Sequence, residues 1–296
     1  MRPPPFAYVK PEAVDEVLGL LTQYGDEARI LSGGQSLLPL LNFRVAYPSY
    51  IIDINGLSDL DYLRDTPDGG LEIGGMTRYR TLETSAAIRD AWPILHEAIE
   101  EIGHVQIRNR GTIGGSLCHA DPGAEMPTVV TALGGSVHLK SARGERKVAA
   151  GDFFVGQLTT SIEPDELLVA VSIPGWSVTS GGAWCEYAAR KGDYGIVGVG
   201  AQVQLDAAGM VERVGLAVMN VGIVPFDATP FATPLMSGKV PDDTIIDKVA
   251  GEVAAAVQPN ADIHATEAYR RHLTAVLVRR ALGTAIARAQ SKTGRS

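Results

Sequence analysis

Apolar and polar positions along the first half of the chain form short blocks that predict strands and helices in alternation. Residues 28–31 and 50–54 are mostly apolar and are bounded by turn residues, which is typical of buried strands. In residues 91–102, apolar side chains recur at helical spacing and predict an amphipathic helix. The other elements predicted in this half are strands at 71–75 and 166–174, helices at 37–43, 81–88 and 125–133, a glycine-containing loop at 108–116, and a hairpin of 136–140 with 145–148.

The pattern changes at residues 175–182, where serine, threonine and glycine cluster, and we place a domain boundary there. Beyond it the sequence predicts a hairpin of two β-rich segments and then two helices, at 196–205, 211–219, 244–257 and 267–289. Alternating elements followed by strands and then helices indicate α+β organisation on both sides of the boundary.

Composition and charge narrow the functional classes. The 296 residues include 45% hydrophobic and 20% charged residues, which is typical of a globular protein with a sizeable core. A net charge of −8 disfavours nucleic acid as a partner. No apolar run approaches the ~18 residues of a membrane span, and the N-terminus lacks a signal peptide's apolar core, so we expect a cytoplasmic protein without a membrane span. Two cysteines are too few for a disulfide framework or for the roughly four ligands of an iron–sulfur cluster.

Two glycine-containing segments are the first candidates for a binding site. The first, Ser32-Gly33-Gly34-Gln35-Ser36, lies between a predicted strand and a predicted helix. Glycine permits positive φ and lets a ligand approach without meeting a Cβ atom, and the helix start adds unpaired N–H groups suited to a diphosphate. Taken alone, the segment is better explained as a plain strand-to-helix turn with a serine N-cap, because Gly-Gly turns are common.

The second segment, Arg110-Gly111-Thr112-Ile113-Gly114-Gly115-Ser116, again combines a hydroxyl residue, paired glycines and a serine. Two such segments in one domain could hold one diphosphate from both sides, and this coincidence favours a binding function. Neither segment matches the G-x-G-x-x-G fingerprint or the G-K-[ST] ending of a P-loop. A Rossmann-type nicotinamide site and ATP hydrolysis are therefore disfavoured.

No set of residues for oxidising a substrate is evident, and we predict no catalytic residue and no metal ligand on this chain. HExxH and GxSxG motifs are absent, and the six histidines are scattered. Two explanations remain equally open for His119, which either contacts a cofactor or closes the second loop. Cys118 fits a small buried residue better than a nucleophile.

At these residues the sequence resembles the FAD-binding medium subunit of molybdenum hydroxylases, the family of xanthine dehydrogenase, aerobic carbon monoxide dehydrogenase and bacterial N-heterocycle hydroxylases. Leu-Ser-Gly-Gly-Gln-Ser-Leu-Leu-Pro at 31–39 resembles the family's first FAD loop, and the long run at 106–127 resembles its second. Further similar stretches lie at 43–44, 52–54, 166–168, 173–174, 190–194, 269–273 and 279–282. The resemblance thus covers nearly the whole chain.

The resemblance implies an α+β fold. Residues 1–176 are expected to adopt the FAD-binding fold of the vanillyl-alcohol oxidase and MurB type, with two α+β subdomains split near residues 55–60. Residues 182–290 are expected to form a small α+β C-terminal domain of the carbon monoxide dehydrogenase flavoprotein type.

The resemblance also implies roles for individual residues. Backbone N–H groups of two segments should hold the FAD pyrophosphate, namely Ser32, Gly33, Gly34, Gln35, Ser36 and Leu37 in the first and Thr112, Ile113, Gly114, Gly115 and Ser116 in the second. Glu125 is expected on the ribose or adenine side, and Ile102 and Leu168 beside the cofactor. Lys191, Asp193 and Tyr194 are expected near the isoalloxazine. This chain departs from many relatives in carrying Glu186 where they have lysine.

Partners follow from the same resemblance. Substrate would be oxidised at molybdopterin on a large subunit, and 2Fe–2S clusters on a small subunit would carry electrons to FAD on this chain. An external acceptor would then take them. The expected assembly is a dimer of heterotrimers that oxidises CO, a purine, another N-heteroaromatic compound or an aldehyde.

Two other classes remain to be distinguished. A self-sufficient FAD-dependent oxidase or reductase of the same fold usually carries a substrate-capping domain, and often a residue that tethers the flavin, and the sequence has no clear candidate for either. A flavin-free interaction protein has less need of two intact glycine pairs.

Overall fold

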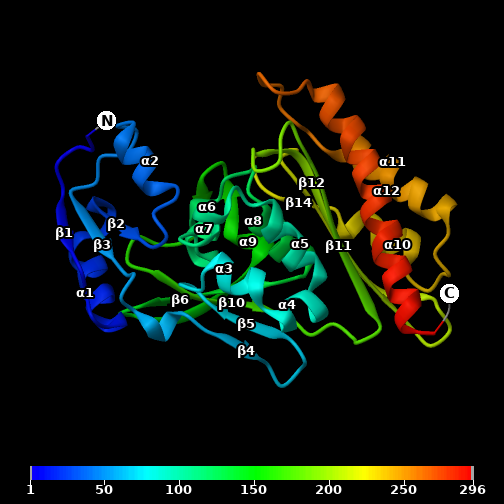
Figure 1. Cartoon of the computed structure of the whole chain (residues 1–296), viewed down its shortest axis with the longest axis horizontal. Helices are drawn as coiled ribbons and strands as arrows, with labels where there is room; N and C mark the ends of the chain where they lie inside the picture. Colours follow the sequence, from blue (N-terminus) through cyan, green and yellow to red (C-terminus); the bar gives the residue numbers. More distant parts are fainter. Residues whose placement is uncertain (1, 295–296) are drawn as a thin grey trace.

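Three main β-sheets follow one another along the chain, with a layer of helices between the second and third (Figure 1). The computed structural model describes residues 2–294. The α+β organisation predicted from the sequence is confirmed. Within the described residues, no helix combines the length and the apolar character that a membrane span requires.

The first sheet is parallel, with strand order β1 (Ala7–Val9), β3 (Tyr50–Asp53), β2 (Ala28–Leu31). Helix α1 (Val14–Tyr24) and the short helix α2 (Leu37–Asn42) connect its strands. The sequence pattern predicted β2, β3 and α2 but missed β1 and α1. Helix α1 begins at an alanine cap without a side-chain hydrogen bond, so the usual start signal is missing.

The second sheet is antiparallel and contains the predicted hairpin. Its strand order is β4 (Leu63–Asp65), β5 (Leu71–Gly74), β10 (Leu167–Ile173), β6 (Ser136–Ser141), β7 (Gly144–Ala149). The remaining short elements flank these two sheets and are η1 (Gly25–Glu27), η2 (Ser58–Leu60), α9 (Ala150–Phe153), β8 (Phe154–Gly156) and β9 (Thr159–Thr160).

A layer of six helices lies on the second sheet, and two predictions for this layer are wrong. The helices are α3 (Tyr79–Thr84), α4 (Ala86–Ala91), α5 (Pro93–Glu101), α6 (Val105–Arg108), α7 (Ile113–His119) and α8 (Glu125–Ala132). The single helix predicted at 81–88 is two, because Ser85 ends α3 and its side chain caps α4 through the amide of Ile88. The loop predicted at 108–116 is partly helical, because Thr112 caps α7 and both glycines of the pair lie in its first turn.

The third sheet is antiparallel, with order β11 (Ser180–Ala188), β12 (Gly195–Leu205), β13 (Val211–Met219), β14 (Phe226–Asp227). Helices α10 (Thr229–Met236), α11 (Asp243–Ala256) and α12 (Glu267–Lys292) cover one face, while α5 and α8 cover the other. Strand β12 is consequently buried along almost its whole length. Strand β11 and helix α10 were not predicted; the first residues of β11 fall in the serine- and glycine-containing stretch interpreted as a domain boundary, and α10 contains two prolines.

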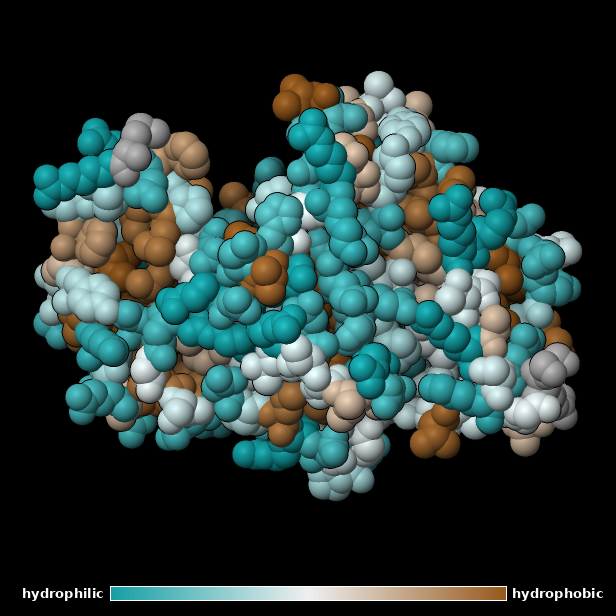
Figure 2. Space-filling view, in the orientation of Figure 1, coloured by the Kyte–Doolittle hydropathy of each residue, from teal (hydrophilic) through white to brown (hydrophobic). Residues whose placement is uncertain are grey.

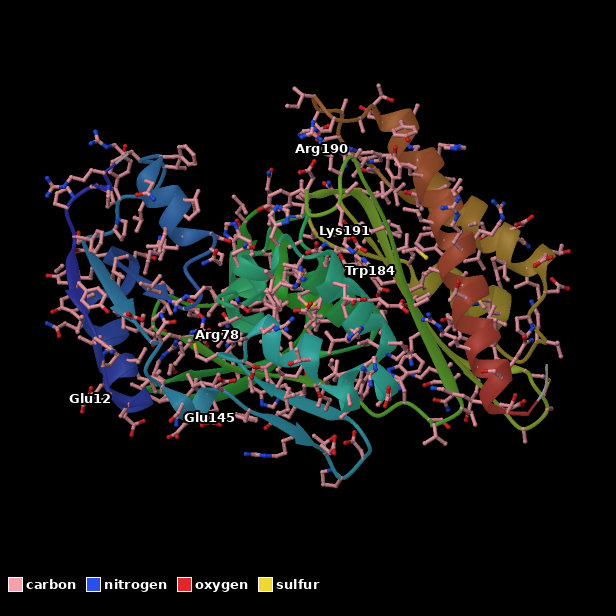
Figure 3. The ribbon with its side chains drawn as sticks, in the orientation of Figure 1. Glu12, Arg78, Glu145, Trp184, Arg190 and Lys191 are labelled. Carbon is pink, nitrogen blue, oxygen red and sulfur yellow. The ribbon has the colours of Figure 1, made fainter. Side chains whose placement is uncertain are left out.

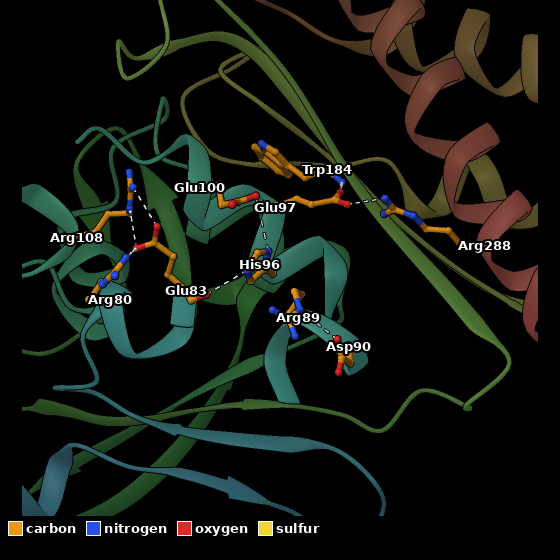
Figure 4. Close-up of polar contacts among 10 residues, drawn as sticks. All are labelled: Arg80, Glu83, Arg89, Asp90, His96, Glu97, Glu100, Arg108, Trp184 and Arg288. Carbon is orange, nitrogen blue, oxygen red and sulfur yellow. Dashed lines mark hydrogen bonds and ion pairs between the residues drawn. The ribbon is translucent and has the colours of Figure 1, made fainter. Parts of the chain in front are cut away.

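A polar contact ties the helical layer to the third sheet and to α12 (Figure 4). The carboxylate of Glu97 on α5 accepts a hydrogen bond from the backbone amide of Trp184 at 2.9 Å and pairs with Arg288 of α12 at 2.6 Å. The central apolar core also runs across this contact, since it contains Trp184 and Met219 together with residues of α5 and α8. The third sheet is therefore one wall of the same core that supports the glycine segments.

Candidate functional site

A cavity of about 770 Å³ lies between the first sheet, the helical layer and the turn that precedes β12. In the surface view, the molecule is hollowed between its N-terminal lobe and the remainder, and apolar side chains gather on the lobe's side of this notch (Figure 2). The volume lies within the range of roughly 300–1,000 Å³ that is usual for ligand and cofactor pockets. All the cofactor-binding residues predicted from the sequence line the cavity except Ile113 and Lys191.

The first glycine segment offers unpaired backbone amides. It follows β2 directly and leads into α2, and every residue from Ser32 to Leu37 lines the cavity. The amides of Gly33, Gly34, Gln35, Ser36 and Leu37 have no hydrogen-bond partner among residues 2–294. Unpaired amides on consecutive residues form a concave site for an anion. Gly34 has φ of +74°, which explains why glycine occupies this position of the turn.

The second segment differs, because four of the five amides predicted to hold the pyrophosphate already have partners, the exception being Thr112 among residues 2–294. The amides of Ile113 and Gly114 donate to the carbonyls of Thr77 and Gly75 at 3.1 and 3.0 Å. The Gly115 amide donates to the Thr112 hydroxyl at 3.1 Å, which is the cap of α7. The Ser116 amide is likewise occupied within the helix turn. These four N–H groups already have protein partners, because the segment is tied into β5 and into its own helix.

The paired glycines serve close packing of backbone against backbone. A Cβ atom added to Gly33 would lie 2.5 Å from the carbonyl oxygen of Arg110 in the second segment. A Cβ atom on Gly114 would lie 2.5 Å from the carbonyl oxygen of Gly75. Glycine at these two positions therefore lets the two segments approach each other and β5, whereas the sequence suggested that it leaves space for a ligand.

Side-chain hydrogen bonds connect the two glycine segments. The hydroxyl groups of Ser32 and Thr112 lie 2.6 Å apart. Arg78, between β5 and α3, donates to the carbonyl of Arg110 and, at 2.6 Å, to the side-chain oxygen of Asn55. The Asn55 amide in turn donates to the carbonyl of Ser32 at 2.8 Å. Arg78 and Asn55 thus bridge the two segments through backbone carbonyls, which leaves the amides of the first segment unused.

The opposite end of the cavity is formed by the turn before β12 and by the turn before α8. Asp193 and Tyr194 line the cavity here, and the Tyr194 ring lies against the backbone of Gly123. Glu125, two residues further along, lines the same cavity at the start of α8. Glu125 and Tyr194 are therefore neighbours. The expectation that Glu125 lies on the ribose or adenine side and Tyr194 near the isoalloxazine therefore concerns two neighbouring residues, and it stays a prediction.

This end of the cavity is acidic and buried. Burial raises the pKa of Glu125 well above its usual range, and the negative charge of Glu186 raises it further. Burial also raises the pKa of Glu186 to about 7, although the Trp184 indole donates a hydrogen bond to this carboxylate at 3.0 Å. The structure therefore places two carboxyl groups that hold protons more tightly than usual beside the Asp193–Tyr194 turn.

Two predicted residues lie outside the cavity lining. The side chain of Ile113 is fully buried in the central core. Lys191 is exposed in the turn before β12, and its label in Figure 3 lies below that of Arg190 at the top of this turn. The lining also includes residues that the sequence analysis did not select, among them Tyr79, His104 and the segment 158–160 after β8. The Tyr79 hydroxyl is buried and makes no hydrogen bond within the described residues, yet a tyrosine on the buried side of a short helix gives no sequence signal that separates it from a core residue.

Helix α6 supports the cavity wall through an ion pair (Figure 4). The Arg108 guanidinium makes two hydrogen bonds of 3.0 Å with the carboxylate of Glu83 on α3 and also donates to the carbonyls of Ile102 and Gly103. Arg80 joins the same carboxylate at 3.0 Å. The pKa of Glu83 is lowered by these hydrogen bonds, which outweigh the effect of its partial burial. The wall that carries Ile102 and His104 is therefore fixed by charge-assisted hydrogen bonds.

Comparison with known proteins gives two family matches that span most of the chain. The family described as "FAD binding domain in molybdopterin dehydrogenase" matches residues 4–176. The family described as "CO dehydrogenase flavoprotein C-terminal domain" matches residues 183–285. Both the glycine segments and the third sheet thus fall within recognised domains.

Individual relatives agree with these matches. The chain is 40% identical to the 6-hydroxypseudooxynicotine dehydrogenase complex subunit alpha of Paenarthrobacter nicotinovorans, over 98% of this chain and 97% of the relative. It is 37% identical to the glyceraldehyde dehydrogenase medium chain of Sulfolobus acidocaldarius, over 95% and 98%. Among solved structures, a chain of carbon monoxide dehydrogenase from Hydrogenophaga pseudoflava superimposes with a TM-score of 0.93 at 33% identity, covering 97% of this chain and 99% of that one.

Proposed function

This chain belongs to the family of FAD-binding medium subunits of molybdenum hydroxylases, and from that premise we propose that it is the electron-transfer subunit of such a complex. It is an FAD-containing oxidoreductase subunit whose fold matches the carbon monoxide dehydrogenase medium chain. We further propose that this chain takes up electrons from the 2Fe–2S clusters of a partner subunit and passes these electrons to an external acceptor.

The observation that supports this proposal most directly is the row of five unpaired amides in a segment that lines one cavity together with the second segment. A diphosphate carries the negative charge that such amides bind, and the bridged segments fix them before the ligand arrives. Because the amides of Ile113 to Ser116 are occupied, whereas the Thr112 amide has no partner among residues 2–294, we infer that the second segment contributes the Thr112 amide and the Ser116 hydroxyl. The residues present therefore fit FAD, with Ser32 to Leu37 as its principal pyrophosphate ligands.

We assign the flavin portion to the end of the cavity that Asp193 and Tyr194 line. FAD, when bound, supplies a carrier that exchanges electrons with both one-electron and two-electron partners. Glu125 and Glu186 then lie on the flavin side, where they can hold protons at neutral pH. Ile102 and Leu168 provide the apolar lining between the two ends.

We also propose which subunit carries out each step. The relatives' names include nicotine, caffeine, glyceraldehyde and carbon monoxide, so chains of one fold serve complexes with chemically different substrates. We infer that the substrate is oxidised at molybdopterin on a large subunit and that a small subunit holds the 2Fe–2S clusters. The exposed apolar side chains of Phe43, Val45 and Tyr47, adjacent in one loop, support contact with a partner chain. A dimer of heterotrimers is the expected assembly.

We propose the same domain division as before, with FAD bound by residues 1–176, whose subdomains meet near 55–60, and with residues 182–290 as the C-terminal domain. The third sheet contributes to the cavity through the turn before β12, so the second domain completes a site that the first one mainly builds.

Isolation of the tagged chain from its native host tests the proposal. We expect it to co-purify with two other subunits, with one flavin, one molybdenum and several iron atoms per heterotrimer. The lone chain should bind FAD but should not reduce a dye acceptor with any organic substrate. Turnover by the lone chain, or a native complex with flavin but neither molybdenum nor iron, would instead favour the self-sufficient oxidase.

A further inference from the structure

Arg270 of helix α12 is a buried cation with three partners on three different segments. Its guanidinium donates to the carbonyls of Ile196 at 2.5 Å and Asn220 at 3.1 Å, and it pairs with Asp262 at 2.6 Å. Only 3% of its side chain is exposed. A buried arginine is costly unless its donors are paired; both terminal nitrogens of Arg270 have partners, whereas its Nε has none among the described residues.

The Ile196 carbonyl that Arg270 binds lies next to a turn that forms the acidic end of the cavity, and the Asn220 carbonyl lies at the end of the adjacent strand β13. Ile196 is the second residue of β12, directly after the turn of Asp193 and Tyr194. Asn220 follows β13 with φ of +61°, a conformation that asparagine tolerates better than most residues. Arg270 therefore holds two turns that arrive from adjacent antiparallel strands.

Asn220 extends the connection to the turn before α8. Its side-chain amide donates to the carbonyl of Gly195 at 2.7 Å, and its backbone amide donates to the carbonyl of Pro122 at 3.0 Å. The turn at Pro122 leads to Gly123, against which the Tyr194 ring lies. A continuous set of hydrogen bonds thus runs from the Arg270 guanidinium to both turns that line the acidic end.

We propose that Arg270, acting through Asn220, is the positioning residue by which the C-terminal helix orders the flavin end of the cofactor site. The inference rests on the proposed function, because it requires that FAD binds in this cavity with its flavin at the Tyr194 end. Arg270 does not line the cavity, so its action is indirect. Within the described part of the chain, no hydrogen bond joins the first glycine segment to this set, so the pyrophosphate end should be independent of Arg270.

The independence of the two ends defines the test. ADP carries the diphosphate and adenine of FAD without the flavin, so the affinities of the full chain for FAD and for ADP report on different ends. In Arg270→Met we expect FAD to bind about tenfold more weakly, with ADP affinity changed by less than about twofold. Flavin absorbance and fluorescence titrations would give the FAD affinity, and calorimetry would give the ADP affinity.

Asn220→Gly is the second variant. Glycine keeps the positive φ and the backbone amide but removes the side-chain donor to Gly195, so the protein should fold even if Arg270→Met does not. Asn220→Gly should show the same loss of affinity for FAD as Arg270→Met, and its affinity for ADP should likewise stay unchanged. Arg271→Met is the matched control, because its side chain is 42% exposed and pairs only with Glu267 one turn away.

Two results would overturn the inference while leaving the proposed function intact. One is an equal weakening of FAD and ADP binding, which would show a general structural role. The other is unchanged FAD affinity and flavin fluorescence in folded Asn220→Gly. If the unsubstituted chain bound ADP but not FAD, the proposed function itself would fail.

Discussion

The hydroxyl oxygens of Ser32 and Thr112 lie 2.6 Å apart, although 80 residues separate them in the chain. Ser32 directly follows β2 and is the first residue of the first glycine segment. Thr112 is the N-cap of α7 in the second glycine segment, so this contact joins the two segments. It sets the separation between the unpaired amides and the helix start. Affinity for a diphosphate should therefore depend on the pair as a unit.

A double-mutant cycle on this pair is the first prediction. Ser32→Ala and Thr112→Val each remove one hydroxyl, and each should weaken FAD binding by about 1 kcal/mol, or about fivefold. The double variant should bind FAD only slightly more weakly than the weaker-binding single variant, because the second substitution removes an interaction that is already lost. FAD titrations of the four proteins give the coupling free energy, and additive losses would contradict the role of the pair.

Thr112→Ser is the control for this cycle. Serine keeps both the contact with Ser32 and the cap on the amide of Gly115, so FAD affinity should stay within about twofold of the unsubstituted chain. Thr112→Val should also lower thermal stability by about 1 kcal/mol through loss of the cap, whereas Ser32→Ala should not.

Gly33→Ala is the second prediction. Its new Cβ atom would lie 2.5 Å from the Arg110 carbonyl, so the two segments must separate. We expect FAD binding to fall at least tenfold, on the order of 1.5 kcal/mol or more, together with a drop in the melting temperature of the FAD-free protein. A variant with normal affinity and normal melting temperature would show that the segments are not held in this contact.

Gly251→Ala provides the comparison, since a Cβ atom there meets nothing within 4 Å. Gly251 is exposed in α11, where alanine is favoured over glycine by up to about 1 kcal/mol. This variant should be more stable than the unsubstituted chain and should bind FAD unchanged. The opposite signs expected at the two glycines separate steric contact from a general effect of glycine replacement.

The two glycine segments show how far sequence reasoning reaches. Their residue types and their place beside strands and helices were enough to predict that they share one cavity. Sequence alone could not show which amides stay unpaired, because the amides of Ile113 and Gly114 are occupied by carbonyls of residues 77 and 75, which only the tertiary fold brings close. The same holds for Glu125, whose neighbour Tyr194 comes from the other domain.

Elements were predicted well where the residue pattern was clear, as in the β-rich run of β12 and the helical spacing of α12, and were missed where it was not. Strand β11 begins inside the stretch predicted as a linker, because its serine and glycines are buried for close packing against β12 and α12. Gly181 illustrates this, since a Cβ atom there would lie 2.1 Å from the Ala285 carbonyl. A single sequence does not distinguish a glycine that is required for close packing in a strand from a glycine that is required in a turn.

The third prediction concerns pH. Burial raises the pKa of Glu186 from about 4.5 to about 7, so the folded chain binds a proton more tightly than the unfolded chain. Stability linked to this group is fully present below pH 4.5 and is lost as pH rises through about 7. The FAD-free protein should therefore lose on the order of 2 kcal/mol of stability between about pH 5 and pH 8. Denaturant unfolding at several pH values measures this slope.

Glu186→Gln should flatten that profile, because the amide cannot ionise. It should also lower the pKa of Glu125, since the charge of Glu186 is one cause of its elevation. Glu252→Gln, at an exposed position of α11, should leave the slope unchanged. Equal slopes in all three proteins would show that Glu186 ionises in the folded protein as it does in the unfolded chain.

Asn55→Ala is the last prediction and tests the bridge behind the two segments. The substitution leaves the Ser32 carbonyl and one donor group of Arg78 without the partners they have in the folded chain. Loss of one partner from a partly buried polar contact costs about 1–3 kcal/mol, and here the cost should appear in FAD affinity, because the unpaired amides begin at the next residue, Gly33. Arg64→Ala is the control, since the Arg64 side chain is 68% exposed and its 3.5 Å pair with Glu72 should contribute less than about 1 kcal/mol. If Asn55→Ala lowered the melting temperature but left FAD affinity intact, the bridge would stabilise the fold without shaping the anion site.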